Sequence, residues 1–348
     1  FLWQRVMESV LPFCVGAVAA LVLRGAVVSS FQSLRFFLSQ FETFSADGTY
    51  NDANLDGVLR RNADVPSLWM NLGYSEAVKD VEHYPTCAAA LARKLADAGG
   101  LAGAGTVCDV SFGYGDQDLL WAREFPALRI VGFNIGPEQQ RVAAARVEAA
   151  GLADRVELRV GSATAIPLPD ASVDVVTSLE SAFHYDTREA FLAEAFRVLK
   201  PGGRVAVADI LYERRPLPTF LGRHLLLYPL SFLLHVLLLK FRPHIPRANV
   251  YGLRVLTEKL RGVGFDAVDA ADVSERVVIW NNARSRTFFP NWAAPLRHPA
   301  VLAPSTLEAL LGRAASAVDG AAWNVYCFTC LNLNGLRYYV YSATKPGA

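Results

Sequence analysis

The sequence lacks a surplus of charge of either sign. Over 348 residues the formal net charge is only +1, and no block of Lys or Arg occurs. A nucleic-acid-binding domain would need a basic face, so we expect no nucleic-acid partner. Internal repeats and low-complexity segments are also missing.

Cysteine is scarce as well, with five residues spread along the chain. Their odd number argues against the disulfide framework of a small secreted protein. Cys327 and Cys330 form a lone Cys-x-x-Cys pair, without the second pair that a structural zinc site needs. We therefore expect buried thiols and no metal site, with a redox or metal role for this pair as the alternative.

No uninterrupted apolar run reaches the length of an ordinary membrane-spanning helix, although two come close. Residues 10–23 are nearly all apolar, and residues 225–239 form a second run with basic flanks. Fifteen helical residues rise about 22 Å, less than the roughly 30 Å thickness of the hydrocarbon core. We expect the second run to lie at the interface, to re-enter the membrane or to pack on another protein. The first could cross the bilayer only if Arg24 snorkels or finds a partner.

Membrane contact is our interpretation of both runs, because the chain is short for burying them. The alternatives are the remnant of a targeting peptide for the first run and a core helix for the second. Tyr228, Ser231 and His235 form one polar stripe on the second run. The stripe would either line a path for a lipid-soluble substrate or hydrogen-bond to headgroups or to the domain beneath. An import sequence cleaved before Phe1 would place the protein in a mitochondrion or plastid.

A glycine-containing turn in residues 106–117 is the most informative feature that is present. A short β-branched run ends at Asp109, a loop carries Gly113 and Gly115, and an apolar helical pattern begins at Leu119. A strand, a tight turn and a helix in this order form the place where open α/β sheets bind nucleotides. Glycine is needed there because a Cβ would block the close approach of a ligand to the backbone.

The spacing of the glycines narrows the choice of nucleotide. A dinucleotide site would have a third glycine where this chain has Asp118, and the Gly-Lys-Ser/Thr of a P-loop is absent. The turn resembles the first motif of class I S-adenosylmethionine (SAM) methyltransferases, Asp/Glu-x-Gly-x-Gly-x-Gly. Asp109, Gly113 and Gly115 match it, and Ser111 replaces its first glycine. An ordinary glycine-containing turn is the alternative.

The next two strands extend this resemblance. A strand over 129–133 is followed by Asn134, where a polar side chain holds the ribose hydroxyls. Ile135 and Gln139 also fit the Gly-x-Asn-x-Ser-x-x-Gln pattern of the branch that acts on sterols, tocopherols, quinones and cyclopropane lipids. A third strand over 155–160 leads to Ser162, where the family has an Asp that accepts a hydrogen bond from adenine. Its loss would weaken cofactor binding by about 0.5–1.5 kcal/mol.

Residues 166–185 resemble the fourth-strand motif of small-molecule methyltransferases of the quinone and rebeccamycin-sugar type. Asp186 is expected to cap the following helix, with Glu189 completing a capping box. That helix should end at Leu199, and the Lys-Pro-Gly-Gly at 200–203 should separate it from a fifth strand over 204–210.

Strands that alternate with helices predict an α/β fold. The resemblance, over about residues 70–345, implies a Rossmann-like, doubly wound and mostly parallel seven-stranded sheet. We expect an N-terminal hydrophobic, membrane-contacting helical segment over 1–45 and cap helices over 46–105. The methyltransferase-like core would then occupy 106–348, with a hydrophobic helical insertion over 212–248 after the fifth strand.

The resemblance implies SAM as the cofactor and a set of cofactor-binding residues. These are Tyr74, Asp109, Ser111, Gly113, Gly115, Gln117, Asn134, Ile135, Gln139, Ser162 and Ala163. Tyr74 belongs to an Asn-x-Gly-Tyr element that covers the sulfonium with an aromatic face. Ser75 replaces the usual Trp of this element, and a core tyrosine is the alternative for Tyr74.

Two residues after the fourth strand are candidates for catalysis. Methyl transfer needs the nucleophile about 3–3.5 Å from the methyl group and in line with the sulfur. An oxygen nucleophile must also lose its proton, and His184 is the best candidate base. Its alternative role is to order the loop or to pack beside the adenine. Glu180 would orient a substrate hydroxyl or help to hold the methionine ammonium group.

Two functions therefore follow from the sequence. The first is a membrane-associated SAM-dependent methyltransferase that acts on a small hydrophobic acceptor such as a quinol, sterol, phenol or lipid. The second is a catalytically inactive accessory or assembly subunit of an organellar membrane complex, with that complex and the lipid surface as partners. The departures from the family pattern at Ser75, Ser111, Gly136 and Ser162 support the second.

Overall fold

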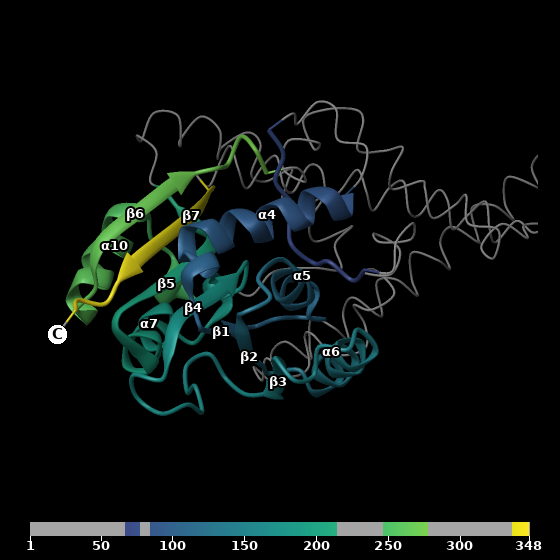
Figure 1. The fold of residues 1–348 in the computed structure, drawn as a ribbon. Helices are drawn as coiled ribbons and strands as arrows, with labels where there is room; N and C mark the ends of the chain where they lie inside the picture. The colour runs from purple at the N-terminus through teal and green to yellow at the C-terminus, as the bar shows by residue number, and fades with distance from the viewer. Residues whose placement is uncertain (1–66, 77–83, 214–245, 278–335, 348) are drawn as a thin grey trace, which may run out of the picture.

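The computed structural model describes residues 67–76, 84–213, 246–277 and 336–347. Within them the chain forms one seven-stranded sheet in the order β3-β2-β1-β4-β5-β7-β6 (Figure 1). The expected N-terminal helix over 1–45 lies outside the described residues, as does nearly all of the insertion. Among the described residues no helix is both long enough and apolar enough to span a bilayer.

The strands confirm the predicted mostly parallel architecture. β1 to β5 run parallel to one another, whereas β7 pairs antiparallel with both β5 and β6. Their bounds are β1 Thr106–Val110, β2 Arg129–Asn134, β3 Val156–Val160, β4 Val173–Leu179, β5 Leu199–Tyr212, β6 Asp266–Asp272 and β7 Leu336–Thr344. The central strands are rich in valine, which suits a pleated surface that is covered on both faces.

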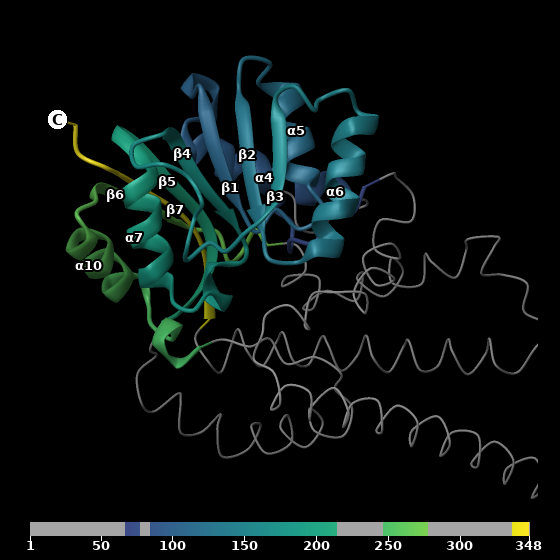
Figure 2. The ribbon, with the colours of Figure 1, turned by 90° about the horizontal axis from the view of Figure 1, so that it is seen from below.

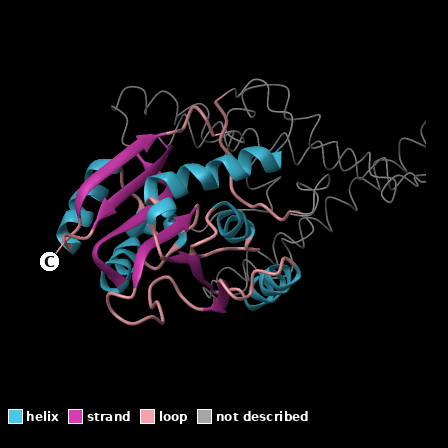
Figure 3. Cartoon of the chain, viewed as in Figure 1, coloured by secondary structure: helices cyan, strands magenta, loops and turns pink. Residues whose placement is uncertain are grey.

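Helices cover both faces of this sheet (Figures 2 and 3). Residues of α4, α5 and α6 pack on one face in the larger hydrophobic cluster, and residues of α7 and α10 pack on the other. The helices are α4 Tyr84–Gly99, α5 Asp116–Glu124, α6 Pro137–Ala149, α7 Arg188–Val198 and α10 Leu253–Val263, with short 3₁₀ turns η3 Leu101–Gly103, η4 Ala182–His184 and η5 Arg247–Asn249. The doubly wound fold predicted from the sequence is therefore confirmed.

Two local expectations around α7 were wrong. Thr187, and not Asp186, caps this helix, because its hydroxyl accepts from the Ala190 amide at 3.4 Å. Glu189 pairs with Lys259 of α10. The fifth strand is also longer than expected, since β5 starts at Leu199, which pairs with β4 before a register shift that accommodates residues 200–203.

Candidate functional site

The predicted glycine turn lies where β1 ends and α5 begins, at the carboxyl edge of the parallel strands. Ser111, Gly113 and Gly115 all have left-handed backbone conformations, with φ values of 64°, 59° and 79°. A Cβ on Gly115 would come within 3.2 Å of Ala143 on α6, so glycine is required for both conformation and space. Ser111 carries a Cβ, unlike glycine, so holding it in this left-handed conformation costs on the order of 1–3 kcal/mol of folding free energy.

Asp109 and Gln117 are brought together beneath this turn. The Asp109 carboxylate accepts from the Thr177 hydroxyl of β4 at 2.6 Å and from the Gln117 amide of α5 at 3.0 Å. Complete burial raises the pKa of Asp109 to about 7, although both hydrogen bonds oppose the rise. Both carboxyl oxygens therefore serve the protein's own framework, and Asp109 can act on a ligand above the turn through its electrostatic field.

An ion pair that sequence reasoning missed holds the other end of the turn. Arg146 of α6 binds both oxygens of Asp116 at 2.7 Å and donates to the Tyr114 carbonyl at 2.5 Å. The amide of Leu68 also donates to the Asp116 carboxylate at 3.1 Å. The pair thus clamps the turn between α6 and the segment at residues 67–76. An arginine 30 positions from its partner belongs to no short motif, so no sequence signal pointed to it.

The polar end of β2 is arranged as a small buried cluster. The Asn134 amide donates to the Gln139 carbonyl oxygen at 2.7 Å, and Ile135 lies half-buried beside them. The Gln139 amide lies 3.8 Å from the sulfur of Met70. That same sulfur would be 3.3 Å from a Cβ placed on Gly113. Met70, which the sequence did not single out, therefore links the glycine turn to the polar end of β2.

Ser162 and Ala163 follow β3 but serve mainly local structure. The Ser162 hydroxyl lies 3.0 Å from the Thr164 hydroxyl and accepts from the Thr164 amide at 3.2 Å. Ala163 is buried in the hydrophobic cluster that contains α7. The expected adenine contact of these residues stays a prediction.

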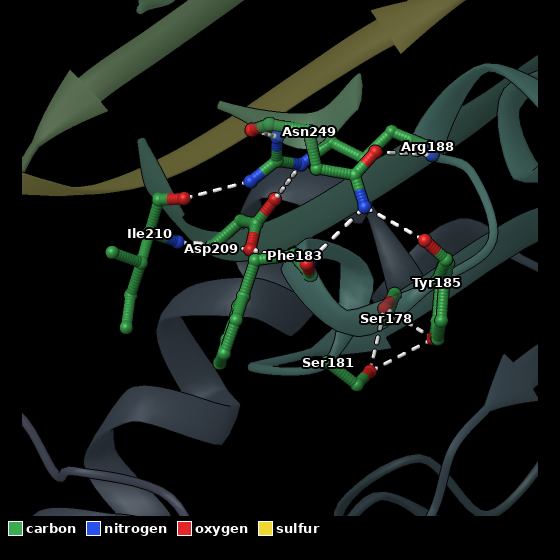
Figure 4. A network of polar contacts seen from close by, with 8 residues as sticks. All are labelled: Ser178, Ser181, Phe183, Tyr185, Arg188, Asp209, Ile210 and Asn249. Atoms are coloured by element: carbon green, nitrogen blue, oxygen red, sulfur yellow. Dashed lines mark hydrogen bonds and ion pairs between the residues drawn. The ribbon is translucent and has the colours of Figure 1, made fainter. Parts of the chain in front are cut away.

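A cluster of hydroxyl groups joins the ends of β1 and β4. The Tyr185 hydroxyl lies 2.9 Å from the Ser178 hydroxyl and 2.8 Å from the Ser181 hydroxyl (Figure 4). It also lies 3.0 Å from the Ser111 hydroxyl. Burial raises the pKa of Tyr185 to about 12, so the group stays a neutral donor and acceptor. Ser111 is the expected departure from the glycine pattern, and here its hydroxyl has a specific partner.

Glu180 lies directly after β4 in a left-handed conformation, with φ of 57°. Its Oε2 accepts from the Leu72 amide at 2.8 Å and from the Tyr338 hydroxyl of β7 at 3.0 Å. Burial and the charge of Glu180 raise the pKa of Tyr338 well above its usual value. Glu180 therefore ties three chain segments together at the carboxyl edge, a role that the sequence did not indicate.

The ring of Tyr74 makes a cation–π contact, but its partner is a lysine of the protein itself. The Lys94 ammonium group lies 4.8 Å from the centroid of the Tyr74 ring, and the Tyr74 hydroxyl bonds to Glu76. Burial, followed by the Glu76 interaction, raises the pKa of Tyr74 to about 12. Its expected contact with a sulfonium stays a prediction.

His184 closes the η4 turn, half-buried, with its ring 4.0 Å from that of Phe183. Asn249 holds both sides of this turn, because its amide group donates to the carbonyls of Phe183 at 3.2 Å and Tyr185 at 2.7 Å. Its side-chain oxygen accepts from the Arg188 amide at 2.9 Å. The candidate base is therefore carried on a turn that is fixed from outside the motif.

A buried ion pair supports this arrangement (Figure 4). The Arg188 guanidinium binds Asp209 at 2.7 Å and the Ile210 carbonyl at 2.7 Å, and it also donates to the Asn249 carbonyl. Asp209 in turn accepts from the Phe183 amide at 3.1 Å. Arg188, Asp209 and Asn249 are fully buried. Residues on both sides of the insertion are thus joined to the turn that carries His184.

Within the part of the chain that the structure describes, no group of three or more His, Cys, Asp or Glu side chains could hold a metal ion. Cys327 and Cys330 lie outside that part.

Comparisons with known proteins show what this region is similar to. The family model described as "Methyltransferase domain" matches residues 108–207. Erythromycin 3''-O-methyltransferase of Saccharopolyspora erythraea is 40% identical over 155 residues, which are 43% of this chain and 48% of that protein. The chain thus spans about half the length of this relative.

Solved structures share the fold. The geranyl diphosphate C-methyltransferase of Streptomyces coelicolor A3(2) superposes with a TM-score of 0.57 at 17% identity, over 85% of this chain and 94% of its own. The cyclase SpnF superposes with a TM-score of 0.58 at 24% identity, over 84% and 94%. At such identities the likeness shows the fold alone. Residues 108–207 therefore match a methyltransferase-domain model, and the described residues share the fold of solved methyltransferases.

Proposed function

We propose that the protein is an active SAM-dependent methyltransferase that acts on a small acceptor. When bound, SAM would supply an activated methyl group on a sulfonium, so the protein has to position the reactants and manage a proton. The observation that carries the proposal is the left-handed glycine turn with Asn134 beside it, at the carboxyl edge of β1 and β2. It lies within the family-matched region, and the chain is 40% identical to a named O-methyltransferase over 155 residues.

The residues around the turn fit this cofactor. Gly113 and Gly115 allow the left-handed backbone that shapes the turn, and Asn134 offers a polar side chain to a ribose. Three carboxyl groups, Asp109, Asp116 and Asp118, lie on β1 and in the first turn of α5. A ligand with a positive sulfur is electrostatically favoured beside the acidic end of this region.

His184 is the proposed base for an acceptor hydroxyl. It lies five residues beyond the end of β4, on the turn that Asn249 holds. The named relatives include methyltransferases for erythromycin, tocopherol and a phytyl hydroquinone. We therefore propose an acceptor of the same chemical kind, a hydrophobic small molecule that carries a hydroxyl group.

Calorimetry with SAM tests the proposal directly. We expect micromolar binding by the full chain and loss of binding in Asp109→Ala, with Glu157→Gln on β3 as a folded control of unchanged affinity. A labelled methyl group should then pass from SAM to a member of a panel of macrolide sugars, quinols and phenols. His184→Ala should lower that rate by about 10²–10⁴-fold at unchanged SAM affinity. Equal loss of rate and affinity would remove His184 from the role of base.

One observation favours the second function, an inactive accessory subunit. The Met70 sulfur lies close above Gly113, and the Tyr185 hydroxyl binds Ser111, so the protein's own side chains approach the turn where a methionine tail would lie. The cyclase SpnF also shows that proteins of this fold carry names other than methyltransferase. If millimolar SAM gives no heat, this second function replaces the first.

We also propose contact with a membrane through the apolar runs at 10–23 and 225–239. The basic residues that flank both runs support this, because they favour anionic lipid surfaces. Co-sedimentation with phosphatidylglycerol vesicles should exceed that with phosphatidylcholine vesicles and fall when 225–239 is replaced by a Gly/Ser linker. Equal recovery with and without vesicles would end this proposal. An organellar location stays a prediction.

A further inference from the structure

Beneath the glycine turn, two carboxyl groups belong to one buried site. Asp109 is the second-to-last residue of β1 and Asp118 lies in the first turn of α5, and both are fully buried. Asp109 has two donors, Thr177 and Gln117. Asp118 differs, because neither of its carboxyl oxygens has a hydrogen-bond partner among the described residues. We call these two groups the carboxyl pair.

A single shared proton resolves this arrangement. Two ionised carboxylates cannot hydrogen-bond to each other, whereas one protonated group donates to the other. Burial and the charge of Asp109 raise the pKa of Asp118 well above its usual value, and burial also raises that of Asp109. The pair therefore titrates as a unit and holds one proton at neutral pH.

Among the described residues, no Lys or Arg side chain hydrogen-bonds to the pair, because Asp109 accepts from Thr177 and Gln117 and Asp118 has no partner. Burial and the charge of Asp109, with a further contribution from Asp116 on α5, raise the pKa of Asp118. Burial and the charges of the pair raise the pKa of the Cys108 thiol on β1. Burial, with Asp109 among the smaller causes, raises the pKa of the Tyr185 hydroxyl beyond β4. Arg146 of α6 is used in the bidentate contact with Asp116. A positively charged ligand at the turn would thus meet an acidic site at which Arg146 is already paired with Asp116.

We propose that the carboxyl pair makes the site specific for the charge of the cofactor. SAM carries a net charge of +1 near neutral pH, whereas S-adenosylhomocysteine (SAH) is neutral. When SAM binds at the turn, the pair releases its proton to solvent and presents a full second negative charge. When the sulfonium has become a thioether, the pair takes a proton back and the product loses that attraction. This inference rests on the proposed function, since it concerns the same site.

Linkage sets the size of the effect. A group that loses one proton on binding makes the affinity rise with pH, by up to tenfold per pH unit below the pKa of the free protein. We therefore expect SAM affinity to rise across neutral pH while SAH affinity changes much less. The ratio of the two dissociation constants should thus change with pH.

Calorimetry of the full chain in phosphate and in Tris measures the proton directly, because the two buffers differ in ionisation enthalpy. We expect SAM to release a substantial fraction of one proton per site and SAH to release close to none. Asp118→Asn keeps the shape of the side chain and removes one carboxyl group of the pair. SAM binding to this variant should therefore no longer release a proton from the site. Glu157→Gln, an exposed carboxylate on β3, should release as much as the native protein.

The outcomes separate this inference from the function on which it rests. Equal proton release with SAM and SAH, or full release by a folded Asp118→Asn protein, overturns the inference and leaves the methyltransferase proposal intact. If Asp118→Asn does not fold, the comparison of SAM with SAH on the native chain decides alone. No heat with SAM at any pH overturns the proposed function, and this inference with it.

Discussion

The buried ion pair between Arg188 and Asp209 allows the sharpest test of how the candidate base is held. Replacing Arg188 with Met removes the guanidinium, which binds the Asp209 carboxylate and the carbonyls of Ile210 and Asn249. Asp209 would then keep only two backbone donors, the amides of Phe183 and Ile210, in a site without solvent exposure. Its charge would be left without a counterion.

The expected cost follows from that geometry. Removing one partner of a buried pair destabilises a protein by about 3–5 kcal/mol, because the remaining charge is neither solvated nor paired. A typical domain has about 5–15 kcal/mol in total, so the urea midpoint should fall by at least about a fifth. The double variant Arg188→Met with Asp209→Leu should recover part of the loss, since it removes the stranded charge but still leaves two carbonyls without a donor.

Urea unfolding followed by circular dichroism measures these differences. Arg159→Met is the matched control, since Arg159 on β3 makes an exposed pair with Glu157 and such pairs contribute at most about 1 kcal/mol. A loss below about 1 kcal/mol for Arg188→Met would refute the reasoning. So would a double variant that is less stable than Arg188→Met alone.

Three further changes test other parts of the structure. Asp118→Asn should stabilise the protein at pH 7–8 but not at pH 3. The pKa of Asp118 is raised in the folded state, so the native protein loses stability as the pH rises above about 4. The loss is about 1.4 kcal/mol for each unit by which that pKa is raised. Thermal melts across pH check this, and parallel pH profiles for both proteins would contradict it. Thr187→Ala removes the cap of α7 and should cost about 1 kcal/mol in urea unfolding, whereas Asp186→Ala should cost less, so the reverse order would restore the original cap assignment. Gly115→Ala should cost about 1–2 kcal/mol for its left-handed backbone and abolish SAM binding in calorimetry, and unchanged affinity would show that the turn does not hold the cofactor.

Local sequence signals determined most of the elements. The β-branched run at 106–110, the glycines that follow it and Pro137 at the start of α6 each act within a few residues, which is the range over which dihedral preferences operate. The order of these elements then left few topologies for the sheet. The start of α7 was missed by one residue, because a distant group, the Asn249 side chain, binds the first amide of the helix.

For the candidate site too, the sequence predicted some residues, and only the tertiary structure showed the others. The sequence correctly placed Asp109, Gly113, Gly115 and Asn134 at the carboxyl edge of the sheet, because the motif shows where β1 and β2 end. Only the tertiary structure showed that Arg146 clamps the turn, that Glu180 joins three segments and that Asn249 holds the turn carrying His184. These contacts connect residues 30 to 158 positions apart. Such partners are chosen by packing in three dimensions, and a polar side chain gives no sign in the sequence of which distant group will satisfy it.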